Sequence, residues 1–391
     1  MPAPSLRIRN TTGDGDDGWA ILYRARDMKA AGLPVADLTI GEHDIGTDAA
    51  ILTEMDRAAR SGHTGYASVP GISALRDSVA ARITSQTGVT TTRDNILITP
   101  GGQAALFAAH HAACNDGDRA LMIDPYYATY PGTIRAVGAV PVAVASRAED
   151  GFQPDATALA AAAPGAASLL INSPNNPTGV VYGDATLAGI AQVAHDHDLW
   201  VISDEVYDTQ IWSGTHQSIR ALPGMSDRTL VVGSLSKSHA MTGSRIGWLC
   251  GPPEMIGHLT NLATNTTYGV PGYIQDAALY ALSMGKAFEA QVAAPFRRRR
   301  EMVLDMLAGQ NLIRAIPPDG AMYVMLDIRA TGLSGDAFAS ALLDAENIAV
   351  MPGESFGQAA AGHLRVALTL PDDQFRPAFA RLLAFAARQA A

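Results

Sequence analysis

Short apolar runs recur along the middle of the chain, and they limit its possible folds more than any other feature. They are NILIT (95–99), RALMID (119–124), VPVAVA (140–145), SLLIN (168–172), LWVISD (199–204), TLVVGS (229–234) and IGWLCG (246–251). Helical periodicity is found at 102–115, 185–198 and 272–292. Strands that are apolar throughout and alternate with helices are typical of a mostly parallel sheet covered on both faces. The sequence therefore predicts an α/β fold whose large domain holds a mostly parallel, seven-stranded sheet between helices.

The pattern changes near residue 295, where RRRREMVLDML predicts a helix. Beyond it, strands are expected at 322–328 and 364–370, and helices near 335–346 and 373–390, which together predict a smaller α+β domain. Three parts are thus expected: residues 1–49 as an N-terminal arm and part of the small domain, 50–294 as the large domain, and 295–391 as the C-terminal small domain. The polar, glycine-rich segment 10–18 is expected to be a flexible or specially folded part of the arm.

Composition narrows the possible partners. The net charge of −10 argues against binding to nucleic acid or to an anionic membrane. Two cysteines, Cys114 and Cys250, provide neither a disulfide framework nor a zinc site and favour a reducing compartment. The first residues lack an apolar signal core, and no apolar run reaches the ~18 residues of a membrane span. We therefore expect a cytoplasmic protein with no nucleic acid, membrane or metal partner.

Polar residues follow four of the apolar runs, where each strand is expected to end. They are Thr99–Gln103, Asn172–Asn176, Asp204–Glu205 and Ser234–Lys237. Because ligands of open α/β sheets bind beyond the carboxyl ends of the strands, a site is predicted there.

Two of these segments suggest a lysine beside a bound anion. SLSKSHAMTGSR (234–245) combines a lysine, several hydroxyls and an arginine. Lysine forms Schiff bases with aldehydes and arginine grips phosphate; the alternative is a solvated loop lysine. PGGQAAL (100–106) places two glycines between a strand and a helix. That arrangement suits an anion-binding turn and, equally, a plain tight turn.

The other two segments offer amides and a carboxylate. NSPNNPTG (172–179) predicts a fixed turn whose amides could donate to a bound oxygen, with an ordinary Asx turn as the alternative. In SDEVY (203–207), the aspartate at the end of an apolar strand needs a cationic partner. Tyr207 lies three residues on, within reach of the same ligand.

Taken in this order, these segments resemble the pyridoxal 5′-phosphate-dependent aminotransferases of fold type I, class I/II (aspartate aminotransferase-like). Further matching segments are DLTIGEHD (37–44), GYASVPGISALR (65–76), DPYYATYPG (124–132), DGAMYVMLD (319–327), PGESFG (352–357) and HLRVAL (363–368). The resemblance extends from about residue 20 to 385. It implies that the large domain binds this cofactor.

The resemblance implies roles around the cofactor ring. Lys237 would be the Schiff-base lysine, whose amine also carries a proton between substrate Cα and cofactor C4′. Asp204 would pair with the pyridine nitrogen and keep the ring an electron sink. Tyr207 and Asn176 would hydrogen-bond the 3′-oxygen. Tyr127 would place its ring over the pyridine, with a core tyrosine as the alternative.

The resemblance also implies how the phosphate and the substrate are held. The expected phosphate ligands are Gly102, Gln103, Ser234, Ser236 and Arg245. Tyr66 would reach the phosphate from a partner subunit, which places the site at a homodimer interface. Arg365 would grip the substrate α-carboxylate as a bidentate pair, assisted by the Gly41 amide and by Asn176.

Two departures bear on the amino donor. Some aspartate-specific relatives have a lysine where this chain has Gln103, so the cation for a second carboxylate is missing. The arm lacks the usual Ser-Pro-Ser-type start and carries Trp19 near where the arm can meet substrate. Both favour a neutral aliphatic or aromatic donor, although a partner-chain residue from 264–273 could still supply selectivity.

The leading hypothesis is an aminotransferase that moves an amino group from an L-amino acid to a 2-oxo acid by ping-pong chemistry on Lys237. The acceptor would be 2-oxoglutarate or pyruvate. The alternative is a carbon–sulfur β-lyase with the same cofactor, which would release pyruvate and ammonia without an acceptor. A non-catalytic sensor of the same fold is less favoured. Arg297–Arg300 are expected on a solvated helix face as salt-bridge partners.

Overall fold

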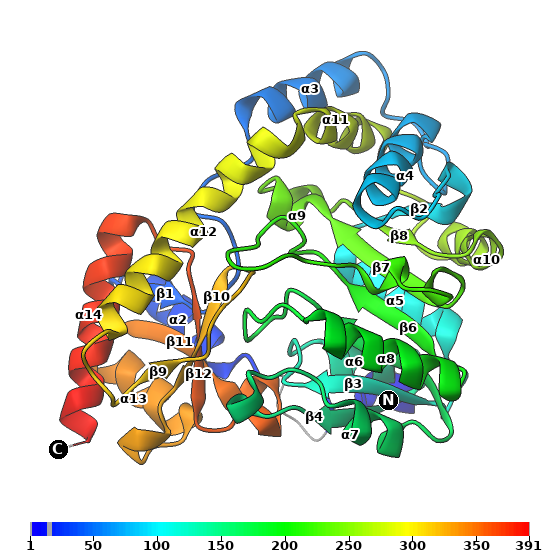
Figure 1. The fold of residues 1–391 in the computed structure, drawn as a ribbon. Coiled ribbons are helices and arrows are strands. Elements are labelled where there is room, and N and C mark those ends of the chain that lie inside the picture. The colour runs from blue at the N-terminus through cyan, green and yellow to red at the C-terminus, as the bar shows by residue number, and fades with distance from the viewer. Residues whose placement is uncertain (1, 14–17, 391) are drawn as a thin grey trace.

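The computed structural model describes residues 2–13 and 18–390, so residues 14–17 of the predicted arm segment lie outside it. Two β-sheets organise the chain, and helices pack around both of them (Figure 1). Among the described helices, none is long and apolar enough to cross a membrane.

The larger sheet has seven strands, as predicted. In spatial order they are β2 (Ile96–Thr99), β8 (Gly247–Cys250), β7 (Thr229–Ser234), β6 (Trp200–Asp204), β5 (Ala166–Asn172), β3 (Arg119–Asp124) and β4 (Val140–Ala145). Strand β8 runs antiparallel to β2 and β7, and the other neighbours are parallel. The predicted fold class is therefore confirmed.

Both faces of the central part of this sheet are buried, which explains why its strands are mostly apolar. The helices before and around this sheet are α1 (Leu6–Arg9), α3 (Ala49–Arg60), α4 (Ser73–Thr87), α5 (Gly102–Ala113), α6 (Tyr130–Ala136), α7 (Ala156–Ala162), α8 (Asp184–Asp196), α9 (Leu235–Ser238), α10 (Pro253–Thr264) and α11 (Gly272–Ser283). On β3, Leu121 and Ile123 pack in the core beneath α7 and α8, whereas Ala120 and Met122 pack in the core beneath α5, α6 and α10.

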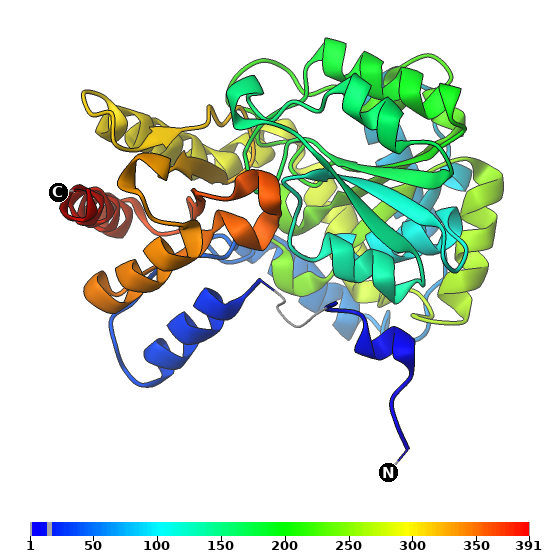
Figure 2. The same ribbon diagram turned by 90° about the horizontal axis from the view of Figure 1, so that it is seen from below.

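The smaller sheet has five strands, which come from both the N-terminal and the C-terminal part of the chain. Its order is β1 (Ala36–Leu38), β11 (Ile348–Pro352), β12 (His363–Ala367), β10 (Tyr323–Asp327) and β9 (Arg314–Ala315). Helices α2 (Ala20–Ala30), α13 (Gly335–Glu346) and α14 (Asp372–Gln389) pack on it, and α2 lies beside α13 (Figure 2). Because β1 pairs in parallel with β11, the N-terminal segment becomes part of this sheet.

One predicted helix is wrong in its extent. The pattern at 272–292 is divided between α11 and α12 (Gly285–Leu307), because Gly285 adopts φ +74° at the break. Helix α12 crosses the predicted boundary at 294/295 without interruption and runs toward α14 (Figure 1). The division into domains at the predicted boundaries therefore stays a prediction.

Candidate functional site

A cavity of about 450 Å³ opens where the carboxyl ends of β5, β6 and β7 face the smaller sheet. Every predicted site residue except Tyr66 lines it. These residues are Gly41, Gly102, Gln103, Tyr127, Asn176, Asp204, Tyr207, Ser234, Ser236, Lys237, Arg245 and Arg365. The structure thus brings together residues that lie more than 300 positions apart in the sequence.

Lys237 lies on α9, the short helix that directly follows β7. The hydroxyl of Ser234 caps this helix by accepting the backbone N–H of Ser236 at 3.0 Å. The Lys237 Nζ donates to the carbonyl oxygen of Gly41. Burial is the main cause that lowers the pKa of Lys237 to about 8. A substantial fraction of this amine is therefore neutral, and nucleophilic, under mildly alkaline conditions.

Asp204 lies at the end of β6 and is 5% exposed. Its Oδ2 accepts the hydroxyl of Tyr130 at 2.6 Å, and its Oδ1 accepts the N–H of Val206 at 3.3 Å. Burial raises the pKa of Asp204 to about 6. No arginine, lysine or histidine of the described chain forms an ion pair with it. A protonated ring nitrogen placed in the cavity would supply the missing cation.

Arg365 lies on β12, is 1% exposed, and has no carboxylate partner among the described residues. Its guanidinium lies between two rings, 4.5 Å from the centre of Tyr323 and 4.4 Å from that of Phe356. One Nη donates to Asn176 Oδ1 at 2.9 Å and the other to the carbonyl of Thr39, while Nε has no partner. A buried cation without an anion is suited to binding a carboxylate.

An anion cradle occupies another wall of the cavity. Gly101 caps α5 with φ +81°, and a Cβ there would lie 2.6 Å from Arg245 Nη2. The hydroxyls of Ser234 and Ser236 are 3.0 Å apart at the same wall. Because the helix N-terminus adds unpaired N–H groups, the wall suits a phosphate. With Lys237 and Asp204, this donor set fits pyridoxal 5′-phosphate.

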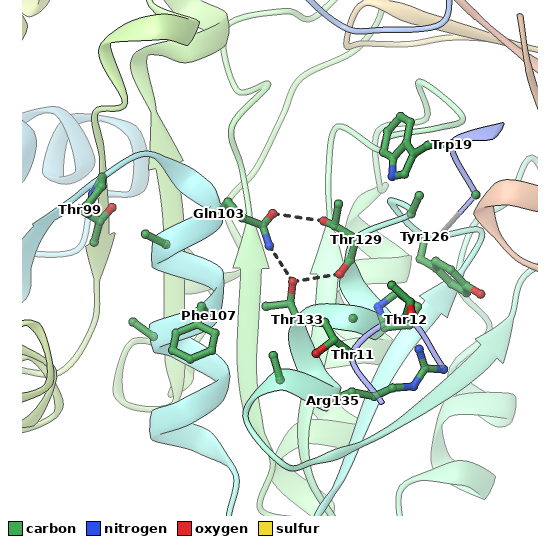
Figure 3. Close-up of a pocket in the computed structure, with 18 of the residues that line it drawn as sticks. Thr11, Thr12, Trp19, Thr99, Gln103, Phe107, Tyr126, Thr129, Thr133 and Arg135 are labelled. Carbon is green, nitrogen blue, oxygen red and sulfur yellow. Dashed lines mark hydrogen bonds between the residues drawn. The ribbon is translucent and has the colours of Figure 1, made fainter. Parts of the chain in front are cut away.

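The side chain of Gln103 has hydrogen-bond partners at α6, and its role at the phosphate stays a prediction. Its side chain donates to Thr133 Oγ1 at 2.6 Å and accepts from Thr129 Oγ1 at 3.2 Å, so the carboxamide is turned toward α6 (Figure 3). Gln103 also lines a second cavity of about 930 Å³, together with Trp19. Because Gln103, Trp19 and Thr129 line both cavities, Gln103 lies on the boundary between them.

The structure does not bring Tyr66 to the other site residues within one chain. It is 91% exposed, and its ring and that of Tyr268 form a T-shaped pair with centroids 5.0 Å apart. Its role across a subunit interface stays a prediction.

Two tyrosines of the site were not predicted from the sequence. Tyr130 donates to Asp204, and Tyr323 contacts both Arg365 and, through a 3.0 Å hydroxyl pair, Tyr207. Tyr323 also explains why residue 41 is a glycine, because a Cβ at that position would lie 1.8 Å from the Tyr323 hydroxyl. Both tyrosines lie inside the motif segments, but no spacing rule singles them out.

Comparisons with known proteins agree with this arrangement. A family model described as aminotransferase class I and II matches residues 34–382. Arginine–pyruvate transaminase AruH of Pseudomonas aeruginosa is 41% identical over 376 residues, which cover 96% of each chain. An aspartate/prephenate aminotransferase of Thermus thermophilus is 35% identical over 93% of this chain and 95% of its own. The solved aspartate aminotransferase of Thermus thermophilus with maleate has a TM-score of 0.91 at 33% identity, covering 98% of this chain and all of the other.

Proposed function

The chain belongs to the class I and II aminotransferases, and we propose that it transfers the amino group of arginine, or of a similar amino acid without a side-chain carboxylate, to pyruvate. The enzyme depends on pyridoxal 5′-phosphate and acts on an amino acid and a 2-oxo acid. The observation that carries the proposal is a single cavity in which Lys237, Asp204 and Arg365 meet, and Arg365 has no carboxylate partner among the described residues. Relatives named as transaminases do not favour the carbon–sulfur lyase.

The residues around the cavity would hold the cofactor at both ends. When bound, pyridoxal 5′-phosphate supplies an aldehyde that condenses with amines and a ring that takes up the electron pair left at substrate Cα. Arg245, Ser234, Ser236 and the backbone at Gly102 and Gln103 would bind its phosphate. Asp204 would hold a proton at the ring nitrogen, Tyr207 and Asn176 would bind the 3′-oxygen, and Tyr127 would cover the ring.

Lys237 would move the proton during the reaction. Its neutral amine would accept the proton from substrate Cα, and the resulting ammonium would hold that proton ready for C4′. Arg365, with the Gly41 amide and Asn176, would fix the α-carboxylate and thereby aim Cα at Lys237. The same residues would serve both half-reactions, because the 2-oxo acid carries the same carboxylate as the donor.

Support for the donor class comes from Gln103, from Glu42 and from one relative, and it replaces the neutral donor expected from the sequence with a cationic one. Gln103 is neutral where a second carboxylate would need a cation, and its carboxamide is engaged by Thr129 and Thr133. Glu42 lines the same cavity, and its Oε1 accepts the Thr242 hydroxyl at 3.0 Å, so the wall carries a carboxylate suited to a cationic side chain. The relative with 41% identity is named an arginine–pyruvate transaminase. A screen of amino donors with pyruvate tests the class, and a preference for aspartate would contradict it.

Gln103→Lys is expected to shift donor preference toward aspartate. The new cation would attract a second carboxylate and repel a guanidinium, so the ratio of kcat/KM for aspartate to that for arginine should rise about tenfold, or ~1.4 kcal/mol. Gln153→Lys is the matched control, because it adds the same charge outside both cavities. An equal shift in both variants, or none in Gln103→Lys, would argue against Gln103 as a selectivity position.

We also propose a cytoplasmic homodimer in which Tyr66 reaches the phosphate of the partner's site. The exposed position of Tyr66 and the two unpaired cysteines support this assembly and location. Residues 50–294 would form the cofactor-binding domain, and 1–49 and 295–391 the arm and small domain.

Tyr66→Phe is expected to weaken cofactor binding about tenfold or more, because it removes a hydrogen bond to a charged phosphate. When Tyr66→Phe and Lys237→Ala protomers are mixed and assayed at limiting cofactor, half of the mixed dimer's sites should be intact, so activity should rise above that of Tyr66→Phe alone. Tyr280→Phe, at another exposed tyrosine, is the control. If mixing restores no activity, Tyr66 does not act across an interface.

A further inference from the structure

Asp124 is a buried carboxylate that the proposed chemistry does not use. It ends β3, is 5% exposed, and does not line the cofactor cavity. No cationic side chain of the described chain pairs with it. Its oxygens instead accept backbone N–H groups, from Gln358 at 3.0 Å and from Ala359 at 3.2 Å. These N–H groups belong to the 353–360 turn, formed by two short 3-10 helices, Gly353–Phe356 and Gln358–Ala360.

The contact between Asp124 and the 353–360 turn is closely fitted. Gly357 has φ +114°, and a Cβ there would lie 2.1 Å from Asp124 Oδ1, so only glycine fits beside the carboxylate. A further bond joins the same parts, since the N–H of Tyr126 donates to the carbonyl of Phe356 at 2.9 Å. The end of the seven-stranded sheet therefore fixes the backbone on both sides of Gly357.

Phe356, whose carbonyl is one of these fixed points, contacts Arg365 with its side chain. Phe356 is fully buried, and its ring centre lies 4.4 Å from the Arg365 guanidinium carbon. Tyr323 covers the guanidinium at 4.5 Å, and Asn176 bonds one Nη. A shift of the turn would move Phe356 and thereby the guanidinium. Because bidentate binding requires a planar group in fixed orientation, such a shift would weaken the grip on a carboxylate.

Stability alone does not explain why a charge is kept at this position. Burial raises the pKa of Asp124 to about 6, despite the bonds from Ala359 and Gln358 that lower it. The folded state thus binds a proton more tightly than the unfolded state. The free energy of unfolding therefore falls as pH rises from about 4 through 6, and the ionised carboxylate is unfavourable above that range. The titratable neighbour is the Tyr126 phenol, whose pKa is raised by burial and by this charge.

We propose that Asp124 is a positioning residue for Arg365: it holds the 353–360 turn, and through Phe356 it sets the affinity for the substrate α-carboxylate. The inference rests on the carboxylate-binding role proposed above for Arg365. It adds a residue outside the cavity, on the opposite sheet, to those that determine substrate affinity.

The test compares Asp124→Asn with Asp118→Asn in the holoenzyme. Asp118 directly precedes the same strand and accepts the N–H of Asn115 at 2.8 Å, so the control removes the same charge from a carboxylate that also accepts a backbone N–H, at a partly exposed position. Three quantities are measured: KM and kcat for the best donor, the Kd of 5-guanidinopentanoate by calorimetry, and Tm. This compound is arginine without its α-amino group, so it carries one carboxylate and its binding needs no turnover. Phe356→Leu is a second variant that removes the ring contact directly.

Asp124→Asn is expected to raise KM and the 5-guanidinopentanoate Kd about fivefold, a size typical of coupling through packed neighbours, with kcat within about twofold and Tm not lowered. Phe356→Leu should raise KM and this Kd in the same way, and Asp118→Asn should change neither. Unchanged KM and Kd in Asp124→Asn or Phe356→Leu, or an equal change in Asp118→Asn, would overturn the inference. Should Arg365→Ala itself leave KM unchanged, the proposed role of Arg365 fails and the inference falls with it. A change in Arg365→Ala but not in Asp124→Asn rejects the inference alone.

Discussion

Lys237→Ala is expected to lower kcat by at least ~10³-fold, because one side chain provides both the nucleophilic amine and the proton carrier. No other described lysine can replace it: Lys29 pairs with Asp37 at 2.9 Å, and Lys286 is exposed on α12. The variant removes the Nζ that donates to Gly41 but leaves α9 and its Ser234 cap in place. The fold should therefore survive, and circular dichroism checks this.

Lys286→Ala is the matched control for this result. It removes one of the three lysines without touching the cavity, so its kcat should equal that of the unmodified enzyme. Residual activity of Lys237→Ala within tenfold of the unmodified enzyme would contradict the assignment of Lys237.

Arg365→Ala is expected to raise KM steeply for every amino donor and every 2-oxo acid. Truncating one member of a buried, hydrogen-bonded charge pair typically costs about 2–5 kcal/mol, so kcat/KM should fall by ~30-fold or more. The loss should be similar for arginine and for alanine, because the α-carboxylate is common to both. Steady-state kinetics with two donors and two acceptors measure it.

Arg297→Ala controls for loss of an arginine in general. Arg297 donates to the carbonyl of Ile211 at 2.9 Å and lies 5.4 Å from the Trp212 ring, away from the cavity. Its kinetics should be unchanged. A loss in Arg365→Ala confined to one donor would mean that this arginine reads the side chain instead of the α-carboxylate.

The large sheet could be predicted because its strands are buried on both faces. In β6, Val201 and Ile202 pack in different cores, so the strand is apolar on both faces until Ser203 and Asp204 at its end. Strands β1 and β9 have three and two residues, too few for a pattern, and β11 was missed. The single helix expected at 272–292 was wrong because Gly285 leaves the helical conformation inside an otherwise helical, apolar pattern.

The site residues that align with the motif segments could be predicted from the sequence. Which of Tyr126, Tyr127 and Tyr130 reaches Asp204 depends on how α6 packs, and no local spacing decides it. The partners of Arg299 could not be predicted from local spacing either. It was expected on a solvated helix face, yet it is 2% exposed and bonded to Asp44 and Asp372, partners 255 and 73 positions away. Only the fold brings such partners together.

The most direct test of the central claim is the visible absorption spectrum of the purified enzyme during separate additions of donor and acceptor. A band from bound pyridoxal phosphate is expected, which is lost when arginine is added alone and is restored by pyruvate. In Lys237→Ala, neither the loss nor the return of the band should occur within the time that the unmodified enzyme needs for both. Absence of the band after incubation with the cofactor, or a band that no amino acid alters, would contradict an aminotransferase built on this cavity.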